Sequence, residues 1–434
     1  TVIIPEPRLP ETFLAENPEL VLDTFSIQSP FQVSMGDYHG VIVQDGHWYI
    51  FGMNQYGQLG TGDNFFVGNL KENRILRERN IIRAECGWYH TLLLDDQGRV
   101  YSMGLNNYGQ LGHQDRYYRN QPTQVQLLLP VQSFHAGAYH SIFLQTNGTI
   151  AVCGLNEYGQ LGLSTNTSTN TTSFLTIPTT VPLPFHVETL CQGSGGFHSF
   201  LIDTSSNVYS TGLNNHGQLG LNDTEQRNQW SLVSSSSFTL SYPIQSIHVG
   251  GWHTLFQDTS GGIYSCGWNE YGQTGHSVSS PFNDISSPIP IIHDTPIYSI
   301  QAGKFHGGWI DEFGQVYLFG NNQVGQLGYN DTQPRTEPTR IMNVGALSVP
   351  NRQTTVHELN MGGYNTIFSY LVQYRETGQF IEEDERYEQI DRLIHGLSIT
   401  GFRDYETIKE EYDTRDVTLQ LEYQWKDRPV ERQE

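Results

Sequence analysis

The chain has 434 residues and a formal net charge of −22, and only 16% of its residues are charged. An acidic chain without a Lys/Arg-rich run repels phosphate groups, so nucleic acids and anionic membranes are poor candidate partners. No apolar run reaches the roughly 18 residues of a transmembrane helix, and we expect no membrane span. The 44 glycines and the 12% aromatic content indicate an all-β protein with many tight turns.

The first element along the chain is a predicted N-terminal extension over residues 1–17. Strand material is expected from Pro18, because residues 18–33 resemble residues 122–134, which lead into the third repeat. We expect this segment to close the last repeat onto the first and so remove a free sheet edge. The N-terminal residues lack a signal-peptide pattern, which favours an intracellular, cytoplasmic protein.

Two short motifs recur along the chain. The first is a Gly-x-aromatic-His turn, which ends at His39, His90, His140, His198, His253 and His306, with Asn365 in a seventh copy. The second is a nonapeptide such as GLNNYGQLG, which starts at Gly52, Gly104, Gly154, Gly212, Gly267 and Gly320. Its glycines suit tight turns that need a positive backbone φ.

The residues between the two motifs predict a β-hairpin. In the second repeat, residues 91–94 and 99–103 are short apolar or alternating runs around an Asp/Gly turn. A sheet of this size cannot bury its faces alone. Radial stacking of such sheets buries them and leaves only short edges, which is the β-propeller solution.

The nonapeptide and its upstream turn resemble the repeats of the regulator of chromosome condensation family over residues 18 to 370. The resemblance implies a seven-bladed propeller, and the six nonapeptides leave a six-bladed ring as the alternative. We therefore predict an all-β propeller over residues 18–372, followed by a small mixed α/β extension over residues 373–434.

The C-terminal extension is acidic, with 17 Asp and Glu against 9 Lys and Arg, which gives −8. The apolar residues Ile390, Leu393, Ile394 and Leu397 are spaced like one face of a helix. A second helix is predicted over residues 403–412, and an amphipathic strand over residues 417–425. Their apolar faces are expected to pack on the propeller or to dock on another chain.

The sequence predicts no catalytic residue, cofactor or metal site. Catalysis needs one asymmetric constellation, whereas the histidines recur once per repeat, so we interpret them as ties between adjacent strands. Motifs for nucleotide binding, serine or zinc hydrolases and EF-hands are absent from the sequence. The four cysteines lack a C-x-x-C pair and are interpreted as buried thiols. They are Cys86, Cys153, Cys191 and Cys266.

Function is expected in residues that do not repeat. Two aromatic pairs follow the last glycine of their nonapeptides by five and six residues, with two arginines beside the second pair. Aromatic and Arg side chains are typical interface anchors, and local capping of the blade cores is the alternative interpretation. The candidates are Phe65, Phe66, Arg116, Tyr117, Tyr118 and Arg119. Residues 164–184 are predicted to be an exposed loop.

The leading functional hypothesis is a non-enzymatic scaffold or assembly subunit that binds other proteins through these loops and the C-terminal extension. The family resemblance implies an alternative, a guanine-nucleotide exchange factor for a Ran-like small GTPase, for which no residues are assigned. A photoreceptor like the plant members of the family is rejected. Those members carry tryptophans in G-W-x-H-T, a position that only Trp88 occupies here.

Overall fold

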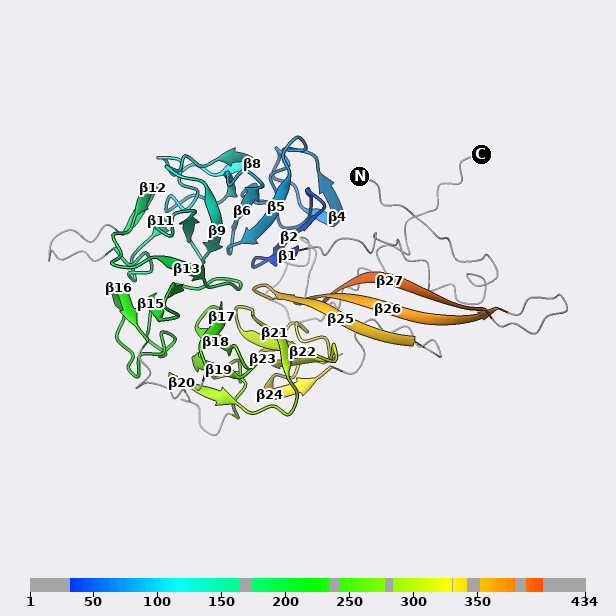
Figure 1. Ribbon diagram of the computed structural model, residues 1–434. Coiled ribbons are helices and arrows are strands. Elements are labelled where there is room, and N and C mark those ends of the chain that lie inside the picture. The colour runs from blue at the N-terminus through cyan, green and yellow to red at the C-terminus, as the bar shows by residue number, and fades with distance from the viewer. Residues whose placement is uncertain are drawn as a thin grey trace, which may run out of the picture.

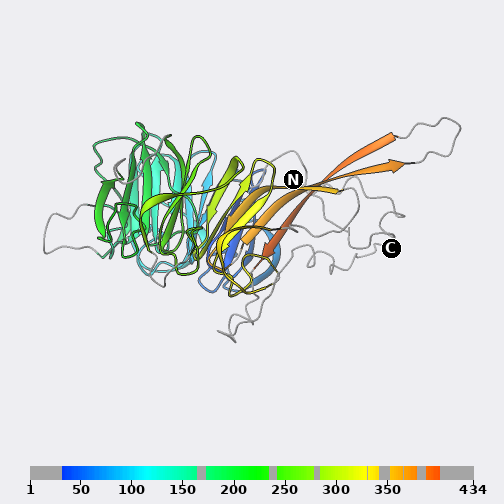
Figure 2. The same ribbon diagram turned by 90° about the horizontal axis from the view of Figure 1, so that it is seen from below.

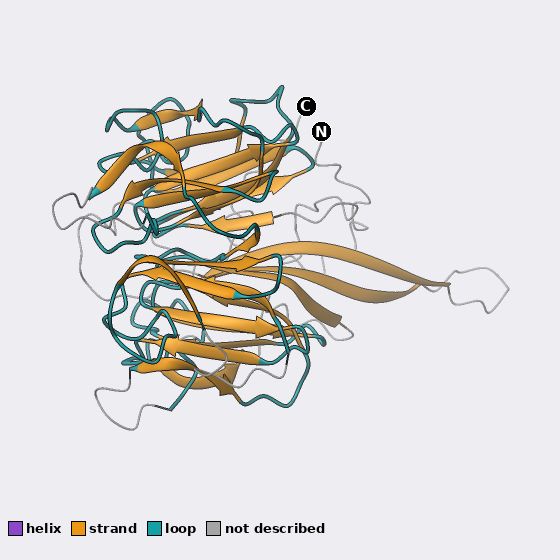
Figure 3. Ribbon diagram, turned by 60° about the vertical axis from the view of Figure 1, so that its left-hand side comes forward, coloured by secondary structure: helices purple, strands orange, loops and turns teal. Residues whose placement is uncertain are grey.

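The computed structural model describes residues 32–163, 173–233, 242–277, 284–329, 331–341, 352–364, 366–378 and 388–400. Every regular element in these ranges is a β-strand (Figure 3). Within them no helix is long and apolar enough to cross a membrane. The prediction of an all-β fold is thus confirmed. The N-terminal segment expected to close the ring lies mostly outside the described residues, and so do the elements predicted over residues 403–425.

Six sheets have four antiparallel strands each, and each sheet is one blade. Blade 1 contains β1 (Gln32–Met35), β2 (His39–Gln44), β3 (His47–Gly52) and β4 (Val67–Asn73). Blade 2 contains β5 (Ile81–Cys86), β6 (His90–Asp95), β7 (Val100–Gly104) and β8 (Arg119–Gln124). Blade 3 contains β9 (Val131–Ala136), β10 (His140–Gln145), β11 (Ile150–Leu155) and β12 (Phe174–Thr180).

The other three blades continue the same order along the chain. Blade 4 contains β13 (Val187–Leu190), β14 (His198–Asp203), β15 (Val208–Gly212) and β16 (Arg227–Leu232). Blade 5 contains β17 (Ile244–Val249), β18 (His253–Asp258), β19 (Ile263–Gly267) and β20 (Ile285–Ile291). Blade 6 contains β21 (Ile297–Ala302), β22 (His306–Asp311), β23 (Val316–Gly320) and β24 (Arg335–Arg340).

The blades surround a central axis, with the first strand of each blade innermost and the fourth at the rim (Figure 1). A three-stranded sheet of β25 (Arg352–Met361), β26 (Thr366–Gly378) and β27 (Glu388–Thr400) lies between blades 6 and 1. Six four-stranded blades match the six-bladed alternative, and the three-stranded sheet fills the remaining gap in the ring. β26 and β27 extend well beyond the ring (Figure 2).

Two sequence predictions, one near the C-terminus and one in blade 3, are wrong. The apolar residues between Ile390 and Leu397 lie in β27, where each residue from Glu388 to Thr400 pairs with one of β26. Pairing along a whole strand, helped by the β-branched Ile390 and Ile394, overrides the helical spacing. The predicted loop over residues 164–184 contains β12, the rim strand of blade 3. The predicted domain boundary at residue 373 falls inside β26, and the division into three parts stays a prediction.

The hydrophobic cores lie between neighbouring blades. One cluster joins Val41, Trp48 and Ile50 of blade 1 to Ala84 and Met103 of blade 2. The second strand of every four-stranded blade is buried along its whole length. Each blade therefore supplies only one side of a hydrophobic core, and its apolar side chains are buried only when the next blade packs against them.

The repeated histidines connect one blade to the next. His140 Nε2 lies 2.8 Å from the Ser199 hydroxyl of the following blade, and that hydroxyl donates to the Gln160 carbonyl oxygen 3.1 Å away. Because the hydroxyl proton is committed to the carbonyl, the imidazole must donate through Nε2. Burial lowers the pKa of His140 well below 6.5, so the ring is neutral with its proton on Nε2. The same contact joins His39 to Thr91, His90 to Ser141, His198 to Thr254 and His306 to Thr366.

Burial of these imidazoles makes the ring sensitive to acid. Burial lowers the pKa of His39, His90, His198 and His253 from 6.5 to about 3. A base with a lowered folded pKa takes up its proton on unfolding, so its stabilising contribution is complete above pH 6.5 and is lost as the pH falls toward 3.

We predict that the free energy of unfolding falls by about 5 kcal/mol per pH unit between about pH 5.5 and 4, the effect of four such protons. Urea unfolding monitored by tryptophan fluorescence at a series of pH values measures this slope. A variant with His90→Gln is expected to show a shallower slope by about one proton. A profile that stays flat over this range contradicts the neutral-imidazole assignment.

Candidate protein-interaction face

The Gly-x-aromatic-His turns and the nonapeptides lie at one end of the ring, which we call the nonapeptide face. The turn follows the first strand of each blade and the nonapeptide follows the third, so antiparallel order places both at the same end. The backbone joins them, since Met53 N donates to Tyr38 O at 2.8 Å. The hairpin turns between the second and third strands, such as Asp95–Gly98, form the opposite end, the hairpin-turn face.

Each nonapeptide is braced from within. The Asn54 side-chain oxygen accepts from Leu59 N at 2.9 Å, and Gln58 Oε1 accepts from Tyr56 N at 3.0 Å. The glycine that starts each copy has a φ of 100° to 110°. At Gly104 a Cβ would lie 2.5 Å from the Tyr89 carbonyl oxygen, so the close approach of the two loops requires glycine there.

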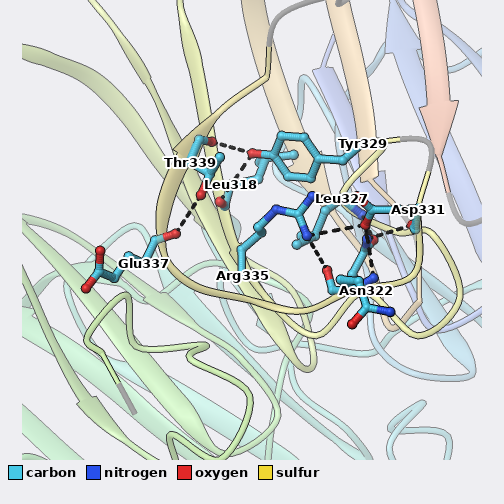
Figure 4. A network of polar contacts seen from close by, with 9 residues as sticks. Leu318, Asn322, Leu327, Tyr329, Asp331, Arg335, Glu337 and Thr339 are labelled. Atoms are coloured by element: carbon cyan, nitrogen blue, oxygen red, sulfur yellow. Dashed lines mark hydrogen bonds and ion pairs between the residues drawn. The ribbon is translucent and has the colours of Figure 1, made fainter. Parts of the chain in front are cut away.

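A second brace, which the sequence motifs did not predict, holds the segment after the nonapeptide. In blade 6 the Asn322 amide donates to Asp331, and Arg335 pairs with the other Asp331 oxygen at 2.7 Å while its guanidinium lies over the Tyr329 ring (Figure 4). The same Asp-x-x-x-Arg clamp occurs as Asp115–Arg119 and Asp223–Arg227. The recurring spacing is the sequence signal for it.

The six candidate binding residues fall into two groups. Phe65, Tyr117 and Tyr118 project from the surface with 77%, 75% and 56% of their area exposed. Their loops lie side by side, since Asn120 of blade 2 contacts Gly62 and Asn64 of blade 1.

The other three candidates have local partners. Phe66 is half-buried against the core between blade 1 and the three-stranded sheet. Arg119 belongs to the Asp-x-x-x-Arg clamp, and Arg116 is exposed but donates to Asn107 O at 2.6 Å and lies over the Phe174 ring.

A further set of aromatic residues surrounds the axis on the nonapeptide face. Each occupies the aromatic position of its Gly-x-aromatic-His turn, and each is half-buried. Six contacts between successive rings have centroid separations of 5.2 to 6.4 Å. We call this set the aromatic collar, and it consists of Tyr38, Tyr89, Tyr139, Phe197, Trp252, Phe305 and Tyr364. These positions belong to the recurring turn, but the sequence alone suggested no role for them.

Three non-repeating residues meet at the centre of the collar. They occupy the x position of the same turns, where other repeats have glycine or alanine. Lys304 Nζ lies 2.8 Å from Asp37 Oδ2 and 3.5 Å from the centroid of the Trp88 ring. Burial raises the pKa of Asp37, against the opposing effect of Lys304. At Gly363 a Cβ would lie 2.4 Å from Asp37 Oδ1, so the space for the pair depends on that glycine.

Apart from the exposed Arg116, the nonapeptide face presents mainly negative charge outside the collar and the clamps. The exposed carboxylates of Glu157, Glu225 and Glu270 take part in no ion pair within the described residues. The guanidinium groups of the clamps are paired with aspartates of the same loops. Cationic groups of a partner would therefore meet an acidic, aromatic surface.

Elsewhere a buried pair faces the interior near the axis. His135 Nδ1 lies 2.9 Å from Glu85 Oε1, and both residues are buried. Burial lowers the pKa of His135, but Cys191 and Glu85 outweigh it and raise that pKa to about 10. All four cysteines are free and buried. Among the described residues no group of three or more His, Cys, Asp or Glu is placed to hold a metal ion.

The ring of sheets, the braced nonapeptides and the histidine contacts define a propeller built from repeats of the regulator of chromosome condensation type. The family model for the RCC1-like domain matches residues 18–368. The chain belongs to this family, as its motifs predicted.

Several curated relatives share part of the chain. A probable E3 ubiquitin-protein ligase, HERC4 of Mus musculus, is 34% identical over 68% of this chain, which spans only 27% of that protein. The human regulator of chromosome condensation is 27% identical over 77% of the chain and 81% of its own length. The ultraviolet-B receptor UVR8 of Arabidopsis thaliana is 26% identical over 85% of the chain and 82% of its own length.

Solved structures share the fold at low identity. Prp20p from Saccharomyces cerevisiae superposes with a TM-score of 0.66 at 20% identity and covers 76% of this chain and 80% of its own. Human WBSCR16 superposes with a TM-score of 0.65 at 18% identity and covers 78% of this chain and 86% of its own. At this identity the likeness shows the fold alone.

The central ion pair yields a stability prediction. Lys304→Met leaves the buried Asp37 carboxylate without its partner, which is expected to cost about 3–5 kcal/mol of unfolding free energy. The double variant Asp37→Asn with Lys304→Met removes both charges and is expected to recover most of that loss. Urea unfolding of the three proteins at neutral pH tests this. Equal stability of the single and double variants would show that the pair is not coupled.

Proposed function

We propose that this chain is a protein-interaction scaffold whose partner docks on the nonapeptide face. The observation that carries the proposal is the aromatic surface there, with Phe65, Tyr117 and Tyr118 exposed on the same face as the collar. Large aromatic side chains held on rigid, braced loops are typical anchors of protein interfaces, because they bury much area at a small entropic cost. The repeated residues are committed to holding the blades together, so the non-repeating ones are free to bind.

The likeness to the family supports protein partners. Prp20p has binding properties toward Gsp1p and histones, and these belong to that protein. This chain spans only 27% of the length of the ligase relative from Mus musculus. The activity of the whole ligase therefore gives no ground for ligase chemistry here. We extend to this chain only the use of the propeller as a binding surface.

Guanine-nucleotide exchange on a Ran-like GTPase is the second candidate function. The similarity to the human regulator of chromosome condensation over most of both chains favours it. Exchange requires no catalytic motif in the propeller, only a surface that opens the nucleotide site of the GTPase. An exchange assay with a Ran-type GTPase loaded with a fluorescent GDP distinguishes it, because an exchange factor accelerates nucleotide release at catalytic concentrations.

For the scaffold, we predict that Phe65→Ala with Tyr118→Ala lowers capture of a specific partner about 30-fold, as expected for the loss of anchor residues worth about 2 kcal/mol. Affinity capture with the full chain, followed by reconstitution with the purified partner, measures the loss.

The matched control is Phe313→Ala with Leu128→Ala. These residues are 65% and 90% exposed and lie at the hairpin-turn face. The control is expected to leave capture unchanged. Equal capture by all three proteins would remove the support for an interface on the nonapeptide face.

A further inference from the structure

The structure contains one cation already held by the aromatic collar. Lys304 Nζ lies 3.5 Å from the Trp88 ring centroid and 5.5 and 5.7 Å from those of Tyr364 and Phe305. Its counter-charge is Asp37, 2.8 Å away. The ammonium thus rests on aromatic faces beside a carboxylate, an arrangement in which the cation is attracted by ring quadrupoles as well as by the opposite charge.

The neighbouring part of the collar, formed by two rings that contact Trp88 at 5.1 and 6.0 Å, has no cation of its own within the described residues. Phe197 and Trp252 are neighbouring collar rings with centroids 6.4 Å apart. Two nonapeptide rings pack against them: Tyr158 edge-on to Phe197 at 5.3 Å, and Trp268 edge-on to Trp252 at 6.1 Å. Within the described residues no Lys or Arg group lies over the Phe197 or Trp252 ring.

Two glutamates lie close in sequence to the nonapeptide rings. Glu157 precedes Tyr158, and Glu270 lies two residues after Trp268; both are exposed and belong to no ion pair within the described residues. Between them His216 lies 5.7 Å from the Trp268 ring and pairs with Asp284 at 2.8 Å. We call this set the acidic arc, and it consists of Glu157, Tyr158, Phe197, Trp252, Trp268 and Glu270.

We infer that the acidic arc binds a lysine- or arginine-bearing segment of a partner protein, with the cationic side chain over the collar rings and the two glutamates beside it. The inference rests on the proposed function and specifies the chemistry of its partner. Charge complementarity selects this occupant, because the arc presents carboxylates and the whole chain carries −22. A second copy of this chain would bring the same negative face and be repelled, and phosphate-bearing nucleic acids would be repelled as well.

The test uses the full chain and a short fluorescein-labelled peptide of alternating lysine and serine. The control is the same peptide with every lysine acetylated, which keeps the length and removes the positive charge. Fluorescence anisotropy gives both dissociation constants at low and at physiological ionic strength. We expect the lysine peptide to bind, the acetylated peptide to bind at least tenfold more weakly, and the difference to shrink as salt rises.

An acidic protein attracts any polycation, so the location must be tested separately. Glu157→Gln with Glu270→Gln removes two exposed carboxylates of the arc and is expected to weaken binding of the lysine peptide about 2- to 30-fold. Glu312→Gln with Asp96→Asn removes the same charge from exposed positions on the hairpin-turn face and is expected to have no effect. Tyr158→Leu, which keeps the charge, is expected to weaken binding about 2- to 5-fold by loss of an aromatic wall.

Two results would overturn the inference. If Glu157→Gln with Glu270→Gln and Glu312→Gln with Asp96→Asn weaken peptide binding equally, the attraction is diffuse and there is no site. If the acetylated peptide binds as tightly as the lysine peptide, the positive charge is not recognised. The proposed function fails by a different result, the unchanged capture of a partner by the Phe65 and Tyr118 variant. If capture depends on those residues but is unaffected by Glu157→Gln with Glu270→Gln, the interface stands and only its cationic chemistry is wrong.

Discussion

The structure depends on the contact between each blade and the next, because no blade buries its own core. The apolar part of this contact is continued by a polar one, in which a neutral imidazole donates to a hydroxyl of the next blade and that hydroxyl donates to a carbonyl of the nonapeptide. Between blades 5 and 6 the hydroxyl is absent, since Gly307 stands in its place, and His253 Nε2 has no hydrogen-bond partner among the residues that the structure describes. There the collar rings of Trp252 and Phe305 stack at 5.3 Å.

A ring of repeats must also be closed where the repeats differ. The three-stranded sheet continues the histidine contacts, since His306 reaches Thr366, and its backbone joins both neighbours through Gly362 and Gly363. The Lys304–Asp37 pair adds a direct contact between blades 6 and 1, the two neighbours of the three-stranded sheet. The same pair breaks the symmetry of the nonapeptide face, because it occurs at only two of the repeated turns, while the exposed Glu157 and Glu270 belong to no ion pair within the described residues.

The repeats made most of the ring predictable from the sequence. Motif spacing located the hairpins, because each copy must repeat the same turns. The contacts that could not be predicted from the sequence depend on closure of the ring. Asp37 and Lys304 are 267 residues apart, and only the closed ring brings them together. The helix predicted near Ile390 failed because pairing with β26 is also non-local. The aromatic collar and the Asp-x-x-x-Arg clamp of Arg119 could have been predicted from the sequence, since both recur at fixed positions in the repeats.

Different positions of the Gly-x-aromatic-His turn serve the packing of the blades and the binding of a partner. In Gly-x-aromatic-His the glycine and histidine are committed, because a Cβ at Gly87 would lie 2.3 Å from the His90 ring and the histidine holds the next blade. The x and aromatic positions face the axis at the nonapeptide face, and nothing in the blade contact fixes their charge. A propeller of this kind can therefore change its partner without altering its packing, which is why family membership alone does not reveal the partner. In this chain the residues that bear on partner choice are Asp37, Trp88 and Lys304, which occupy x positions where the other repeats have glycine or alanine.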